Sequence, residues 1–214
     1  GILERRLARE SETTGALASA AAERALRKAA CVAEDVDLIV VATMTPDEAC
    51  TPVSAQVQRR LGADRAAGYD IHVACSGFVT ALSTVDALIG VGRYRTALVI
   101  AAERMSSVVD FTHRESCVLF GDGAGAVVLS SREAQSGLPH SSAILEHLQG
   151  LYGHGGDAIW MSRANDETDA ERRRGGYLRM AGRDVFRFAV SALCTQVESL
   201  ARRHDLRVGD IDWI

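Results

Sequence analysis

The stretch "YDIHVACSGFVTALSTVDALIGVG", residues 69–92, joins two kinds of sequence pattern. "YDIHV" is short and mostly apolar, which predicts a strand. From Phe78 to Ile89 the apolar residues recur at the spacing of one helix face. A strand that passes through a tight Ser-Gly turn into a helix is typical of α/β proteins, and Cys75 lies at that junction.

The pattern continues on both sides of this junction. Further strands are predicted at "DLIVVAT" (37–43), "TALVIAAE" (96–103) and "AGAVVLSS" (124–131), and helices at residues 11–30 and 51–63, the second with Pro52 in its first turn. From about residue 132 to 176 the chain is polar, which predicts loops and short strands. A long helix with an apolar stripe from Phe186 to Leu200 follows. The alternation predicts an α/β protein with a largely parallel sheet.

A repeat connects the two ends of the chain. "DVDLI" at 35–39 matches "DIDWI" at 210–214 without a gap, and Arg27-Lys28 then falls on Arg202-Arg203. A helix, a polar link and a strand recur, as expected of an internally duplicated fold. The sequence predicts a first part over 1–131 and a second over 132–214. We expect the second half to be incomplete in this chain, because it stops on its first strand.

Composition and charge narrow the class of protein. The chain has 214 residues, 47% of them hydrophobic, and a net charge of −4, which favours neither nucleic acid nor an anionic membrane as a partner. No apolar run approaches the roughly 18 residues of a membrane span. The five cysteines and six histidines form no CxxC or HExxH pattern, so neither a disulfide framework nor a metal site is predicted. We expect reduced thiols and a cytoplasmic protein.

Two interpretations of Cys75 compete. An unpaired cysteine is usually a small buried hydrophobe. At the start of a helix, however, the positive end of the dipole favours the thiolate, and the carboxyl edge of a sheet is where α/β proteins place their sites. We therefore predict that Cys75 is a nucleophile. Strand alternation puts His72 on the same face as Ala74, which makes it a poor candidate for the general base.

Two other stretches of the sequence could have a binding function. "FGDGAGAVVL" (120–129) is not a dinucleotide fingerprint, because its glycines lead into a β-branched run and not into a helix. Six arginines lie between residues 171 and 187, at 172, 173, 174, 179, 183 and 187. They form either a solvated face or a surface for an anionic partner. Arg183 and Arg187 share a helix face at i, i+4 spacing.

Seven motifs taken together resemble the β-ketoacyl-acyl carrier protein synthase III family. They are "GILERR", "TPD", "DIHVACSGF", "AAERMS", "VLFGDGAGAVVL", "YLRMAGRDVFRFAV" and "DIDWI". These are the initiating ketosynthases of the thiolase superfamily. The resemblance covers the whole chain except Ser131 to Arg174, where it is poor. It implies a thiolase-like fold, internally duplicated in an α/β/α/β/α layered architecture.

The resemblance also implies an acyltransferase that needs no cofactor, with a coenzyme A thioester as substrate. The cysteine matching Cys75 takes an acyl group from acyl-CoA, and malonyl-acyl carrier protein is then decarboxylated and condensed with it. Arg114 matches an arginine that contacts the CoA adenine region. The remaining matched positions border the pantetheine channel (Gly182 and Phe186), the carrier-protein docking surface (Arg183 and Arg187) and the acyl pocket at the interface of a homodimer (Cys50 and Thr51).

The same resemblance places a catalytic histidine and asparagine beyond Ile214. We therefore expect residues 1–214 alone not to perform the full condensation. The alternatives are a starter-unit acyltransferase of the same fold that does not condense, or a non-catalytic dimerising partner or fragment. The sequence names neither the acyl group nor the pathway, which is fatty-acid initiation or polyketide priming.

Overall fold

The computed structural model describes residues 2–131, 142–161 and 176–212. The chain divides into two compact units. The first unit comprises Gly1–Ser107 with Phe120–Ala143, and the second comprises Val108–Leu119 with Ile144–Ile214. Each unit is described below on its own.

The first unit is built on a four-stranded sheet. Its strands are β1 (Leu38–Ala42), β2 (Ala67–Ile71), β3 (Thr96–Arg104) and β4 (Asp122–Ser130), in the order β2-β1-β3-β4. β1 runs parallel to both β2 and β3, whereas β4 pairs antiparallel with β3. The predicted largely parallel sheet is confirmed, with β4 as its antiparallel member.

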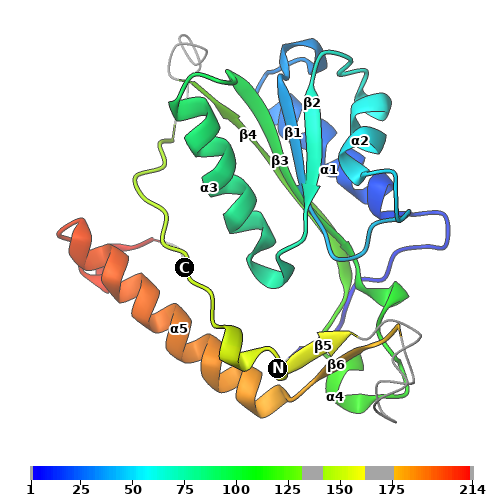
Figure 1. Cartoon of the computed structure of the whole chain (residues 1–214), viewed down its shortest axis with the longest axis vertical. Coiled ribbons are helices and arrows are strands. Elements are labelled where there is room, and N and C mark those ends of the chain that lie inside the picture. The colour runs from blue at the N-terminus through cyan, green and yellow to red at the C-terminus, as the bar shows by residue number, and fades with distance from the viewer. Residues whose placement is uncertain (1, 132–141, 162–175, 213–214) are drawn as a thin grey trace. The chain divides into compact units, whose positions relative to one another are not determined.

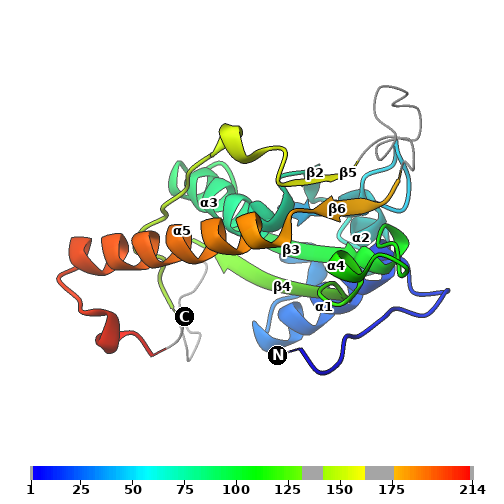
Figure 2. The ribbon, with the colours of Figure 1, turned by 90° about the horizontal axis from the view of Figure 1, so that it is seen from below.

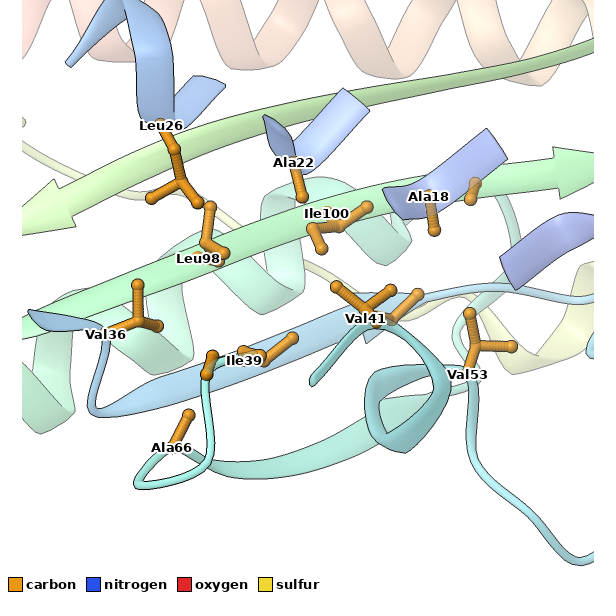
Figure 3. Close-up of a cluster of buried hydrophobic side chains, with 13 residues drawn as sticks. Ala18, Ala22, Leu26, Val36, Ile39, Val41, Val53, Ala66, Leu98 and Ile100 are labelled. Carbon is orange, nitrogen blue, oxygen red and sulfur yellow. The ribbon is translucent and has the colours of Figure 1, made fainter. Parts of the chain in front are cut away.

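Helices cover both faces of this sheet. α1 (Thr14–Lys28) and α2 (Val53–Leu61) lie on one face, and α3 (Gly77–Gly90) lies on the other (Figures 1 and 2). Successive residues of β1 therefore pack in turn against the helices on the two faces. Ile39 and Val41 pack with α1 and α2 (Figure 3), whereas Leu38 and Val40 pack with Ala81 and Val85 of α3. All five residues of β1 are buried, as expected of a strand covered on both faces.

Some helices and strands begin or end at other residues than the sequence predicts. Thr13 caps α1 by accepting a hydrogen bond from the Ala16 amide, and Pro52 is the N-cap of α2 and not part of its first turn. β2 begins at Ala67 and ends at Ile71, so the prediction of a strand through Val73 is wrong. The alternation argument about His72 therefore does not apply, since His72 lies after the strand.

The second unit contains a short helix, a two-stranded sheet and a long helix. These are α4 (Arg114–Cys117), the antiparallel pair β5 (Ile159–Met161) and β6 (Leu178–Met180), and α5 (Gly182–Arg203). α4 lies beside β6 (Figure 1). No helix among the described residues is long and apolar enough to cross a membrane.

The division into units differs from the predicted boundary at residue 131. The segment Val108–Leu119 groups with the later part of the chain and not with the first part. The reason is that residues of this segment contact residues of β6, which lie far away in the sequence. The Leu178 amide donates to the Val108 carbonyl at 2.8 Å, and the Arg179 guanidinium pairs with Asp110.

The predicted repeat is visible in the backbone. A shift of 175 residues carries Asp35 onto Asp210, and it also carries the end of α1 at Lys28 onto the end of α5 at Arg203. The same shift relates two of the three non-glycine residues with positive φ in the described chain, Ala30 (49°) and Asp205 (55°). It also carries the 3-10 helix η1 (Ala33–Asp35) onto η5 (Val208–Asp210).

The hydrogen bonds that end the two helices repeat as well. The Cys31 amide donates to the Leu26 carbonyl at 3.0 Å, and the Leu206 amide donates to the Ala201 carbonyl at 2.8 Å. These are the long bonds of a Schellman-type helix end. The buried face of α1 maps onto apolar residues of α5 under the same shift: Ala18 on Leu193, Ala22 on Val197 and Leu26 on Ala201.

The strand predicted at 210–214 is not formed where the structure describes the chain. Asp210 belongs to η5, and Ile211 and Asp212 are not in a strand. Trp213 and Ile214 lie outside the described residues. Along the stripe of α5, Phe186 is 70% and Leu193 is 62% exposed.

Candidate active site

Cys75 lies in a sharp backbone elbow between β2 and α3. β2 ends at Ile71, and the 3-10 helix η2 (Ala74–Ser76) leads directly into α3. Ala74 has a φ of 46°, in the left-handed region that residues with a Cβ rarely adopt. Such a conformation costs on the order of 1 kcal/mol or more and is held only by its surroundings. The elbow leaves the Cys75 side chain exposed.

Small residues hold the elbow against the sheet. A Cβ added at Gly77 would lie 2.9 Å from the Cβ of Ala42, at the carboxyl end of β1. Glycine is therefore required for this approach of the α3 N-terminus to the strand. The Ser76 hydroxyl donates to the Val73 carbonyl at 2.9 Å, which closes the turn.

α3 begins at Gly77, two residues after Cys75. Its N-cap, Ser76, makes no side-chain capping bond, so the first amides of the helix have no partner from that side chain. The helix is 14 residues long, and the positive end of its dipole favours negative charge at this point. The arrangement suits a cysteine that reacts as its thiolate.

A cavity of about 220 Å³ lies between the loop at residues 46–52 and the end of β2. Cys50 and Thr51 line it from the loop, and Ile71 and His72 line it from the strand side. The structure thus brings Cys50 and Thr51 together with His72, and all three belong to the first unit. Cys75 is not among the residues that line this cavity.

Glu103 anchors the chain that leads into this loop. The Met44 amide donates to the Glu103 carboxylate at 2.7 Å, and the Thr45 hydroxyl donates to it at 2.6 Å. The pKa of Glu103 is raised, because the effect of burial exceeds the lowering effect of its hydrogen bonds and of the nearby His72. The carboxylate therefore fixes the start of the loop that carries Cys50 and Thr51.

Two aspartates that sequence reasoning did not single out fix the helices around the site. Asp47 accepts from the Thr14 and Gly15 amides at the start of α1, each at 2.8 Å. Asp70 accepts from the amides of Val53 and Ser54 at the start of α2, at 2.6 and 2.8 Å. Each carboxylate satisfies amides that a helix N-terminus leaves without partners.

The glycine-rich stretch after Phe120 also has a structural role. Asp122 accepts from the Ala8 amide and from both the amide and the hydroxyl of Ser106, all at 2.7 Å. A Cβ at Gly121 would lie 2.9 Å from the Arg6 carbonyl oxygen. The stretch therefore lets the N-terminal segment pass close to β4, and β4 continues from it as a strand. The glycines therefore lead into a strand and not into a helix.

The other predicted site residues belong to the second unit. Arg114 is the first residue of α4 and is exposed. Gly182 begins α5, and Phe186, Arg183 and Arg187 are exposed along its first turns. Of the six clustered arginines, Arg172, Arg173 and Arg174 lie outside the described residues. Arg179 is paired with Asp110 at 3.0 Å, so it does not contribute a free positive charge.

Comparison with known proteins gives one consistent result. Residues 69–145 match the family model of 3-oxoacyl-[acyl-carrier-protein (ACP)] synthase III. The chain is 43% identical over 214 residues to the β-ketoacyl-[acyl-carrier-protein] synthase III of Rhodospirillum centenum, and 44% identical over 215 residues to that of Rhodospirillum rubrum. These matches cover the whole chain and 64% and 65% of the two relatives.

Solved structures agree with the sequence matches. The priming β-ketosynthase of the R1128 polyketide pathway superposes with a TM-score of 0.85 at 36% identity, over 97% of this chain and 60% of that one. The 3-oxoacyl-[acyl-carrier-protein] synthase III of Aquifex aeolicus superposes with a TM-score of 0.83, also at 36% identity, over 97% and 61% of the two chains. The chain belongs to the β-ketoacyl-acyl carrier protein synthase III family.

Membership of the synthase III family confirms the resemblance seen in the motifs, and with it the thiolase-like fold. The match to the synthase III family model begins at Tyr69 and therefore includes the elbow and Cys75. Among the described residues, no group of three or more His, Cys, Asp or Glu side chains could hold a metal ion.

Proposed function

We propose that the full-length protein is a condensing enzyme that starts an acyl chain on Cys75. The Cys75 thiolate attacks the carbonyl carbon of an acyl-CoA, the acyl-sulfur bond to CoA breaks, and CoA leaves as a thiol after taking up a proton. Malonyl-acyl carrier protein then loses CO2, and its α-carbon forms a bond to the acyl carbonyl carbon. Cys75 is released as the leaving thiolate.

One observation carries this proposal: an exposed cysteine at a strained strand-to-helix elbow, in a chain 43% identical to a curated synthase III. A buried structural cysteine needs neither the positive φ at Ala74 nor the close approach of Gly77 to Ala42. Both features cost stability or limit the choice of residue. Their presence around one thiol supports a reactive role for Cys75.

The roles of the other residues follow from the resemblance and are part of the proposal. Arg114 contacts the adenine end of CoA, Gly182 and Phe186 border the channel for the pantetheine arm, and Arg183 and Arg187 meet the acidic carrier protein. The first part of the chain serves as the nucleophile-bearing half. The later part connects to the second half and begins it.

We further propose a cytoplasmic homodimer. β2 pairs only with β1 among the described strands, so its outer edge offers backbone groups to a second copy. The cavity lined by Cys50 and Thr51 adjoins the end of the same strand. A partner at this edge would therefore border the proposed acyl pocket, which supports the assignment of these two residues.

Mass spectrometry of the full-length protein tests the first half-reaction. Incubation with acetyl-CoA should add one acetyl group, which peptide mapping should locate on Cys75, and the Cys75→Ala variant should gain none. Adding malonyl-acyl carrier protein should then release CO2 and form a β-ketoacyl product. Acylation without product would favour a starter-unit acyltransferase. No acylation of Cys75 with any acyl-CoA would refute the proposal.

A further inference from the structure

An ion pair that is largely shielded from solvent ties the segment that carries Arg114 to β6. The Arg179 guanidinium lies 3.0 Å from the Asp110 carboxylate, and the two side chains are only 12% and 19% exposed. The exposed pair Arg207–Asp210 of the same unit has exposures of 88% and 36%. Shielded pairs are screened less by water and salt, and they fix geometry better than exposed ones.

Asp110 uses its two oxygens for different tasks. Its Oδ1 accepts from the Thr112 amide at 2.9 Å and from the Thr112 hydroxyl at 2.6 Å, while its Oδ2 accepts from Arg179. The Asp110 carbonyl also accepts from the His113 amide at 3.0 Å, which closes a turn. The hydrogen bonds from Thr112, followed by the contact with Arg179, lower the pKa of Asp110 to about 2, so it is ionised at neutral pH. One carboxylate thus shapes the turn and fastens it to β6.

This turn runs directly into α4. The His113 carbonyl accepts from the Cys117 amide at 3.0 Å, and the His113 Nδ1 lies 3.1 Å from the hydroxyl of buried Ser116. Arg114 itself takes part in no ion pair among the described residues, and its side chain is exposed. The direction of the Arg114 side chain therefore depends on how the turn before it is held.

We infer that Asp110 and Arg179 are positioning residues that hold Arg114 toward the adenine end of CoA. The inference rests on the proposed function, in which Arg114 makes that contact. Arg179 acts through Asp110 and the turn and does not itself touch the substrate. Its Nη2 donates to Asp110 and its Nη1 donates to the Leu178 carbonyl at 3.4 Å, a fixed pair of contacts that a lysine ammonium does not reproduce. This explains why one member of the arginine cluster faces a carboxylate and not a partner's surface.

Steady-state kinetics of the full-length protein with two thioesters test this inference. One substrate is acetyl-CoA, and the other is acetyl-N-acetylcysteamine, which lacks the adenine end. Arg179→Gln should raise KM for acetyl-CoA on the order of tenfold, which corresponds to about 1.4 kcal/mol of lost binding, with kcat nearly unchanged. Its KM for the short thioester should not change. Arg179→Lys should recover part of the loss, and Arg207→Gln, the matched exposed pair, should have no effect.

The Arg114→Ala variant distinguishes failure of the proposed role of Arg114 from failure of the inference about Asp110 and Arg179. It should raise KM for acetyl-CoA, and adding Arg179→Gln should raise it little further, because both changes remove the same contact. If Arg114→Ala has no effect, both the proposed role of Arg114 and the inference are wrong. If it has an effect and Arg179→Gln has none, only the inference is wrong. Equal losses with both thioesters, or fully additive losses, would mean that the pair merely stabilises the fold. If Arg179→Gln fails to fold, Arg179→Lys and Asp110→Asn decide by the same comparison.

Discussion

Replacing Gly77 with alanine tests whether the elbow depends on the contact between α3 and β1. The added Cβ would lie 2.9 Å from the Ala42 Cβ, whereas carbon atoms pack best at about 3.5–4.0 Å. The helix start must therefore move by roughly 0.6–1 Å. Overpacking of this kind costs about 1–3 kcal/mol, and the better helix propensity of alanine offsets at most about 1 kcal/mol. We expect Gly77→Ala to lower the free energy of unfolding by about 1–2 kcal/mol.

The displacement should also affect chemistry, because Cys75 lies two residues before Gly77. Urea unfolding of the full-length protein would measure stability, and the rate of Cys75 acetylation by acetyl-CoA would measure the position of the thiol. Ala42→Gly removes the opposing Cβ. The double variant should therefore regain stability and acetylation relative to Gly77→Ala alone. Gly90→Ala is the matched control in the same helix, since nothing lies within 4 Å of its added Cβ.

Two results would refute this reasoning. Gly77→Ala could prove no more destabilising than Gly90→Ala, which would mean that the approach to Ala42 is not tight. Alternatively, Ala42→Gly could fail to restore the double variant. The defect would then not come from the contact with Ala42.

Three further predictions follow from individual groups. Limiting iodoacetamide should label Cys75 before Cys31, Cys117 and Cys194. For Cys31 the reason is that burial and Asp35 raise its pKa and so disfavour its thiolate. Equal labelling of all cysteines in the folded protein would contradict this prediction. The lowered pKa of Asp110 means that the stability it contributes is present above about pH 4 and is lost as the pH falls toward 2. The melting temperatures of wild type and Asp110→Asn should therefore differ at pH 6 and converge at pH 2, and a constant difference would argue against the ionised pair. Reversing Arg183 and Arg187 to glutamate should raise KM for malonyl-acyl carrier protein by several-fold to some tens-fold, at about 1 kcal/mol for each rim contact. The defect should shrink as salt increases, while acetyl-CoA acylation stays nearly normal; equal losses with both substrates would exclude a docking role.

The elements of the first unit could be predicted because burial leaves a local pattern. β1 is apolar at every position and is covered on both faces, so its sequence alone indicates a central strand. The orientation of β4 could not be predicted in this way. Its apolar run is compatible with either direction, and only its pairing with β3 makes it antiparallel. The end of β2 was misplaced because the chain leaves the sheet early to reach the positive φ of Ala74.

The carboxylates that hold the site were missed for a different reason. Asp47 and Asp70 bind amides that lie 33 and 17 residues away in sequence, at Thr14 and Val53. Asp110 is 69 residues from Arg179. An aspartate in a loop gives the same local signal whether it faces solvent or a distant helix. The fold has to be known before such a residue can be assigned a role.

Cys75, the proposed nucleophile, illustrates what a sequence motif can and cannot convey. Exposure does not distinguish Cys75, because Cys50 and Cys194 are exposed as well. What separates it is backbone geometry: the positive φ of the residue before it and the helix that starts after it. That geometry is maintained by Ala42 and Gly77, which carry no reactive group and only permit a close approach. The small residues around a cysteine therefore indicate its chemistry better than the cysteine itself does.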